Sequence, residues 1–203
     1  MTDAQQTCPG GDTVSATRDT TGPVNPDAQA AARALLAVLD HSEVTTKVDE
    51  RLFEALLAYG LQSIPGLGSA LFSCGSDVAF DLGQRGGQAD IVGYQNHELV
   101  VECEVKLHSN IHWPQGRCQL DNYADFAPAN AQLFLLTAQN RLAKIEKELR
   151  EVRSGQRWTV LHDRTLREAV AQAAGPLPVG DGSAERLIYA LARLVDTEAQ
   201  DLA

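Results

Sequence analysis

Cysteine pairs, long apolar runs and an excess of positive charge are all missing from this chain of 203 residues. Its four cysteines form no Cys-x-x-Cys pair and no zinc-binding spacing, which excludes the common zinc modules. No apolar run approaches the length of about 18 residues that a membrane-spanning helix needs. Residues 1–25 have neither a basic start nor an apolar block, so we expect a flexible lead-in and not a signal peptide. A reducing cytoplasm is the expected setting.

Positive charge is scarce but unevenly distributed. The chain has 17 Lys and Arg against 27 Asp and Glu, a net charge of −10, which disfavours binding to a phosphate backbone unless the charges are segregated. Residues 141–167 contain eight basic residues and only four acidic ones. One interpretation is a nucleic-acid interface in which Arg153 and Arg157 contact phosphate. The other is a solvated helix with internal pairs such as Lys144 with Glu148.

Residues 26–203 are predicted to form a single domain. Apolar residues make up 44% of the chain and charged residues 22%, which is ordinary for a soluble globular protein. Strand-like alternation and helical spacing both occur, which predicts an α/β fold with a central mixed sheet of about four to five strands flanked by helices. Residues 60–76 contain the interrupted stretch Ile64-Pro65-Gly66-Leu67-Gly68 and are expected to form a loop.

The clearest strand signal lies between Leu99 and Leu107. Alternation gives this strand two faces, with Val101, Cys103, Val105 and Leu107 on one and Glu102, Glu104 and Lys106 on the other. A second strand-like run precedes it across a short turn, so the two pair most simply as a hairpin. That pairing brings Asp90 near Glu104 and Lys106. Glu102 is either an outer group of the same site or a solvated residue, and we favour solvation.

Two carboxylates and one ammonium group suit a magnesium site. Mg²⁺ takes oxygen ligands and often only one or two protein carboxylates, leaving other positions to water and substrate phosphate. Asp90 and Glu104, with 13 residues between them, match that number. A lysine beside them could orient or deprotonate an attacking water.

Asp90 followed by Glu104-Val105-Lys106 resembles the motif of the PD-(D/E)xK nuclease superfamily. Some branches of that family carry Gln-x-x-x-Tyr on the next helix, and Gln119-Leu120-Asp121-Asn122-Tyr123 stands at that place. The chain departs from the pattern at Ala89, where the family name has proline. The resemblance covers roughly residues 46–162, with C-terminal helices expected over residues 165–200.

The resemblance implies a restriction-endonuclease-like fold and Mg²⁺-dependent hydrolysis of DNA, with Mn²⁺ as a substitute. The implied catalytic residues are Asp90, Glu104, Lys106, Gln119 and Tyr123. The implied metal ligands are Asp90, Glu104 and the backbone carbonyl of Val105. Some members use a glutamate from the helix before the sheet, which makes Glu54 a further candidate on a flank that it shares with Glu50. Trp113 could stack on a base or cap the core.

Two other classes of function stay open. One is a catalytically silent binding or regulatory module that keeps the fold. The other is an acidic protein-interaction partner in which the motif is accidental. We expect DNA as the partner, with a homodimer as a candidate assembly and neither a membrane nor an organic cofactor involved.

Overall fold

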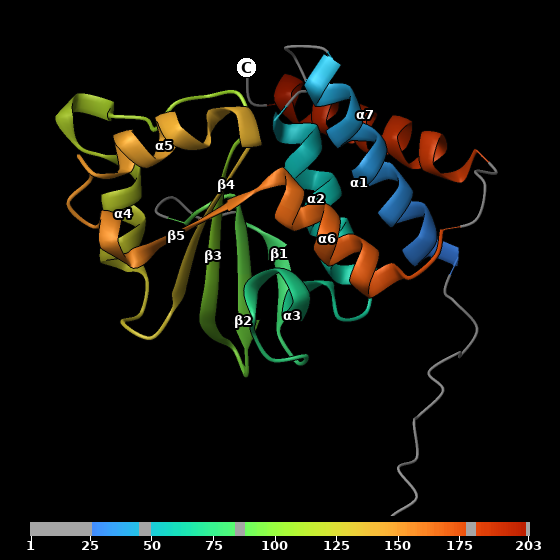
Figure 1. Ribbon diagram of the computed structural model, residues 1–203, viewed down its shortest axis with the longest axis horizontal. Helices are drawn as coiled ribbons and strands as arrows, with labels where there is room; N and C mark the ends of the chain where they lie inside the picture. The colour runs from blue at the N-terminus through green and yellow to red at the C-terminus, as the bar shows by residue number, and fades with distance from the viewer. Residues whose placement is uncertain (1–25, 45–49, 84–87, 178–181, 202–203) are drawn as a thin grey trace, which may run out of the picture.

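The computed structural model describes residues 26–44, 50–83, 88–177 and 182–201, and Figure 1 shows a sheet with helices on both faces. The expected lead-in, residues 1–25, lies outside the described residues. The strands are β1 (Ala79–Leu82), β2 (Ile91–Gln95), β3 (Glu98–Lys106), β4 (Gln132–Thr137) and β5 (Trp158–His162). They stand in the order β1-β2-β3-β4-β5. The predicted α/β class, with a mixed sheet flanked by helices, is confirmed.

The hairpin of β2 and β3 is also confirmed. The two strands pair antiparallel, with Gln95 opposite Glu98, so the turn consists of Asn96 and His97. Both turn residues have positive φ, 51° and 67°, a pattern typical of the turns whose twist matches that of a hairpin. Asn tolerates this left-handed conformation better than most residues.

The pairing of neighbouring strands changes from antiparallel to parallel at β3. Strands β1 to β3 are antiparallel, whereas β3, β4 and β5 run parallel. Parallel neighbours need crossover connections, and these contain α4 (Gln119–Phe126) and α5 (Leu142–Leu149). Both helices pack over one face of the sheet around a smaller core that includes Leu120, Leu133 and Ile145. All of β4 except Gln132 is buried, as expected for a short apolar run with a strand on either side.

The other face carries a larger core. The helices over it are α1 (Pro26–Val44), α2 (Glu50–Ser63), α3 (Leu67–Phe72), α6 (Asp163–Ala174) and α7 (Ser183–Asp201). Within the described ranges, no helix is long and apolar enough to cross a membrane.

The interpretation of residues 60–76 as a loop was wrong. α2 continues to Ser63, and α3 follows from Leu67 to Phe72. Gly60 is a packing residue and not a break, because a Cβ there would lie 2.5 Å from the Leu35 Cδ1 atom of α1. Gly66, with φ of 80°, supplies the left-handed residue before α3.

Candidate active site

The charged face of β3 points toward the smaller core. Glu102 and Glu104 have no solvent-exposed surface, and Lys106 is 8% exposed. In register they stand beside residues of β4, with Glu102 next to Leu133 and Glu104 next to Leu135. The preference for a solvated Glu102 was therefore wrong, because α4 and α5 cover the face that the alternation identified only as charged.

The hairpin brings Asp90 to the same place. Ile91 pairs with Cys103, so the next position along the ladder sets Asp90 opposite Glu104. The Asp90 Oδ2 atom accepts a hydrogen bond of 2.8 Å from the backbone N–H of Val105. Asp90 is thereby fixed to the middle residue of the Glu-x-Lys motif.

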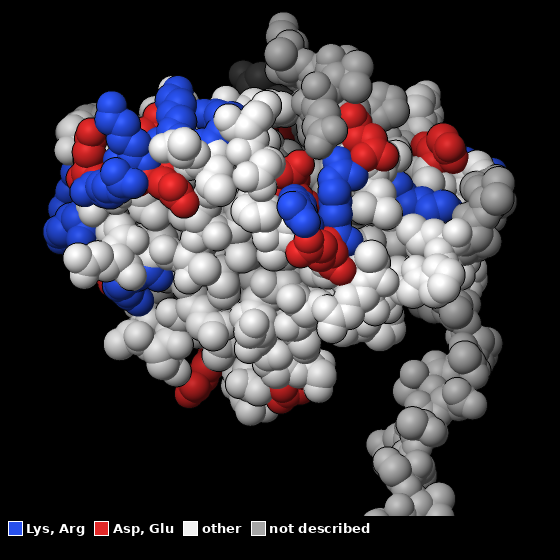
Figure 2. Space-filling model, viewed as in Figure 1, with Lys and Arg blue, Asp and Glu red and all other residues white. Residues whose placement is uncertain are grey.

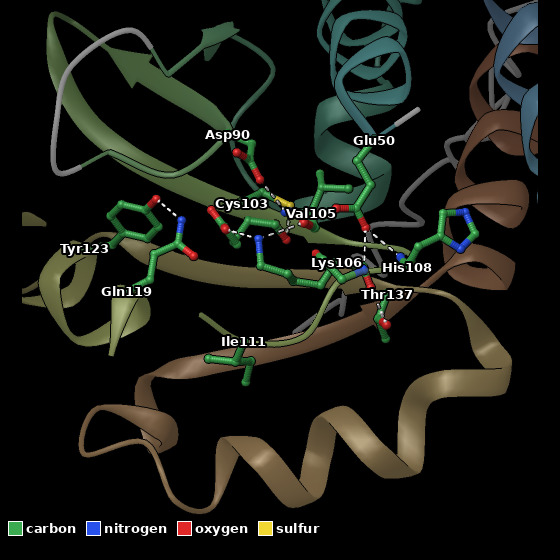
Figure 3. Close-up of polar contacts among 12 residues, drawn as sticks. Glu50, Asp90, Cys103, Val105, Lys106, His108, Ile111, Gln119, Tyr123 and Thr137 are labelled. Atoms are coloured by element: carbon green, nitrogen blue, oxygen red, sulfur yellow. Dashed lines mark hydrogen bonds and ion pairs between the residues drawn. The ribbon is translucent and has the colours of Figure 1, made fainter. Parts of the chain in front are cut away.

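The Lys106 side chain lies beside Glu104 and Val105 (Figure 3). Its Nζ atom donates to Glu104 Oε1 and to the backbone carbonyl of Val105, the latter at 3.1 Å. The second carboxylate oxygen of Glu104, Oε2, is buried and has no hydrogen-bond partner among the described residues. Both carboxylate oxygens of Glu102, on the same face of β3, are likewise buried without a partner in the described part of the chain.

Burial and mutual repulsion disturb the acids of this site. Burial, followed by the charge of Asp90, raises the pKa of Glu104 to about 8. Burial also raises the pKa of Asp90, despite the hydrogen bond from Val105. Burial alone would lower the pKa of Lys106, but the charges of Glu104, Asp90 and Glu50 outweigh it and hold that pKa above its usual value. Lys106 is therefore a cation near neutral pH.

Two further acids come from α2. Burial, and then the charge of Asp90, raises the pKa of Glu54 to about 7, which places Glu54 within the electrostatic reach of the site. Glu50 behaves differently: burial would raise its pKa, but hydrogen bonds from backbone amides outweigh burial and lower it. Its Oε1 atom accepts from the N–H groups of His108 and Ser109, at 2.6 and 2.9 Å. Sequence reasoning missed this contact, since nothing local signals a bond across 58 residues.

α4 brings Gln119 and Tyr123 to the site. They share one face of the helix, and the Gln119 amide donates to the Tyr123 hydroxyl (Figure 3). Burial, and then the charge of Glu104, raises the pKa of Tyr123, so its hydroxyl keeps its proton at neutral pH. The charge of Glu104 therefore acts on the Tyr123 hydroxyl.

Trp113 lies outside this cluster. It is 42% exposed and precedes a short 3₁₀ helix, Pro114–Gly116. It borders a surface pocket of about 220 Å³ that is also lined by Arg117, Asn122 and Arg153. Of the two alternatives for Trp113, the structure thus favours a surface position over a cap on the core.

The two candidate DNA-binding arginines already have partners inside the protein. Arg153 donates to both carboxylate oxygens of Asp125 at 2.7 Å. Arg157 donates to the backbone carbonyls of Ala124 and Pro128, at the end of α4 and just beyond it.

Other side chains of the basic segment, residues 141–167, also have partners within the protein. The expected pair of Lys144 and Glu148 is present at 3.7 Å, and Arg164 pairs with Glu168 at 3.0 Å. Figure 2 shows Lys and Arg gathered over α5 with acidic side chains among them. Much of this segment's positive charge is therefore neutralised locally.

The donor set fits a magnesium ion that leaves most of its coordination to water and substrate. Within the described residues, no group of three or more His, Cys, Asp or Glu side chains is arranged to hold a metal ion. Asp90 and Glu104 supply the one or two carboxylates that Mg²⁺ usually takes from a protein. The buried Oε2 atom of Glu104 is the carboxylate oxygen that such an ion would take.

Comparison of the chain with protein-family models, with curated proteins and with solved structures finds no match.

Proposed function

We propose that the chain is a nuclease of the PD-(D/E)xK type with a restriction-endonuclease-like core, which hydrolyses phosphodiester bonds of DNA with Mg²⁺. One observation carries the proposal: Asp90 and Glu104 stand opposite each other beside Lys106, with Glu104 Oε2 buried and unpartnered. Such an arrangement of buried acids is more costly than useful in a purely structural role.

In this proposal Asp90 and Glu104 hold Mg²⁺, or Mn²⁺ in its place, and Val105 contributes its carbonyl oxygen. The bound metal lowers the pKa of a water ligand and offsets negative charge at the phosphate. The hydrogen bond from Val105 N–H fixes the Asp90 carboxylate, which spares it the entropy of finding the ligand position. Glu54 is a further ligand candidate from α2.

Lys106 acts as a donor in this proposal. In the metal-free chain the surrounding carboxylates hold the pKa of Lys106 high, and its ammonium can orient a water or a phosphate oxygen. Gln119 and Tyr123 supply neutral polar groups at the flank of the same site, where they can contact substrate.

The test is incubation of the purified protein with linear, circular and single-stranded DNA in the presence of Mg²⁺, Mn²⁺ or EDTA. We expect cleavage with either metal and none with the chelator. The Asp90→Asn variant is the matched control for a contaminating nuclease. DNA binding without cleavage in all arms would instead indicate a silent binding module, and absence of both would favour a protein-interaction role.

A further inference from the structure

Glu50 connects two parts of the molecule that both contribute to the candidate site. It is the first residue of α2, and its Oε1 atom accepts from two consecutive backbone N–H groups just beyond β3, those of His108 and Ser109 (Figure 3). Two charge-assisted bonds to one oxygen make a strong and directional anchor. The start of α2 is therefore fixed to the chain segment that leaves the sheet.

Site residues lie close to both ends of this anchor. Lys106 is the last residue of β3, two positions before His108. Glu54 follows Glu50 by four residues on α2, so the two share a helix face. Glu54 responds to the charges of Asp90 and Lys106, which come from the sheet. A change in how α2 meets the end of β3 would move Glu54 relative to those groups.

We propose that Glu50 is a positioning residue, which holds α2, and with it Glu54, against the end of β3 that carries Glu104 and Lys106. Its effect on metal binding rests on the proposed function, whereas its role as an anchor does not. In this role Glu50 binds the two amides and not the metal. A glutamine, whose side-chain oxygen accepts the same two bonds, should replace it.

The chain supplies a matched control on the same loop. The Glu148 Oε2 atom accepts from the N–H of Ile111 at 3.1 Å, so it anchors the loop from α5, on the other face of the sheet. The partners of Glu148 in these bonds are Ile111 and Lys144, neither of which belongs to α2. Loss of Glu148 loosens the loop without releasing the helix that carries Glu54.

The experiment compares Glu50→Ala, Glu50→Gln, Glu148→Ala and, as the reference for a lost ligand, Asp90→Asn with the parent chain. The two measurements are amide hydrogen exchange and Mn²⁺ titration followed by electron paramagnetic resonance, both without DNA. We expect Glu50→Ala to lose protection at His108 and Ser109 and to bind Mn²⁺ about 10- to 100-fold more weakly, the range typical of residues that orient metal ligands. Glu50→Gln should keep that protection and lose less than about fivefold in affinity, since it keeps both bonds. Glu148→Ala should lose protection at Ile111 alone.

Three results would overturn the proposal. Full protection of His108 and Ser109 in Glu50→Ala would show that the anchor is absent. A loss of Mn²⁺ affinity in Glu50→Gln as large as that of Asp90→Asn, with protection kept, would make Glu50 a ligand. An equal loss in Glu148→Ala would show that loop order in general, and not α2, controls the site. Failure of the parent chain to bind Mn²⁺ would refute the proposed function, while hydrogen exchange would still decide the anchor.

Discussion

The charged face of β3 and the basic segment from Arg141 to Arg167 contain the same kinds of side chain in very different surroundings. On this face Glu102, Glu104 and Lys106 are buried, and oxygens of Glu102 and Glu104 lack partners among the described residues. In the basic segment exposed side chains form pairs with nearby acids, such as Arg153 with Asp125 and Arg164 with Glu168. Each exposed pair of this kind contributes about 0–1 kcal/mol to stability.

Burial is what separates the two regions. A buried carboxylate without a partner costs several kcal/mol, so a chain retains one at the expense of stability. An exposed ion pair, in contrast, changes the free energy of unfolding only slightly. The contrast makes the charged face of β3 the better target for functional tests. The basic segment stands out in the sequence only because the chain as a whole is acidic.

The largest effect is expected from the acid pair. Asp90→Asn or Glu104→Gln should reduce cleavage of DNA by about 10³-fold or more, because each removes a ligand of the metal that stabilises the transition state. The thermal midpoint of the metal-free variants should stay the same or rise, since repulsion between the acids is relieved. Cleavage rates with Mg²⁺ and melting curves in EDTA measure the two. Full activity in either variant would end the assignment.

Substitution of Lys106 should have the second-largest effect on cleavage. Both Lys106→Ala and Lys106→Arg should lower the single-turnover rate by on the order of 10², the scale of a well-positioned proton donor or acceptor. Arginine keeps the charge, but its planar guanidinium cannot take the place of a compact ammonium. Rates at saturating enzyme exclude effects on binding. A near-normal rate in Lys106→Arg would reduce the role of the lysine to general attraction of phosphate.

Glu102 offers a test of burial alone. Burial raises its pKa from 4.5 to about 7, so the native state keeps a proton that the unfolded chain releases. The stability that buried, protonated Glu102 contributes is therefore complete below pH 4.5 and should be lost as the pH rises from 4.5 through about 7. Glu102→Gln should remove that loss and make the change in unfolding free energy between pH 5 and pH 8 smaller by about 1–3 kcal/mol.

Urea unfolding at the two pH values in EDTA measures this change. The control is Glu98→Gln, which alters an exposed glutamate at the start of the same strand. An equal effect of both substitutions would show that burial is not the cause.

The smallest effect is expected in the basic segment. Arg153→Gln should change the slope of log K for DNA against log salt by less than roughly half a unit, because Asp125 already neutralises the guanidinium. Asp125→Asn, which frees Arg153, should strengthen binding at low salt. Equilibrium titrations over a range of salt concentrations give both slopes. A decrease of about one unit in Arg153→Gln would mean that the arginine leaves Asp125 to contact phosphate.

Local patterns in the sequence predicted several elements of the sheet. Alternation in β3, the short turn at Asn96 and His97, and the apolar run of β4 each predict an element from a few adjacent residues. The same pattern placed Asp90 beside Glu104. α3 was missed because Pro65, Gly66 and Gly68 were interpreted as breaks, although Gly66 supplies the left-handed residue that precedes the helix.

Contacts between distant segments explain the other omissions. Alternation shows that Glu102 and Glu104 share a face, but only α4 and α5 determine that this face is buried. The bond of Glu50 is to backbone amides, which any residue can offer, so no side-chain pattern identifies it. Arg153 meets Asp125 across 28 residues, and no periodicity links the two.

The sequential order of the strands has a consequence for how the site assembles. Asp90, Glu104 and Lys106 belong to one hairpin with a two-residue turn, and such local contacts form on a microsecond timescale, before the long crossovers to β4 and β5 close. In that early hairpin the carboxylates are still hydrated. They lose water only when α4 and α5 dock, so the energetic penalty of the acids falls on the late steps of folding. We therefore expect neutral variants of these acids to accelerate docking and leave hairpin formation unchanged.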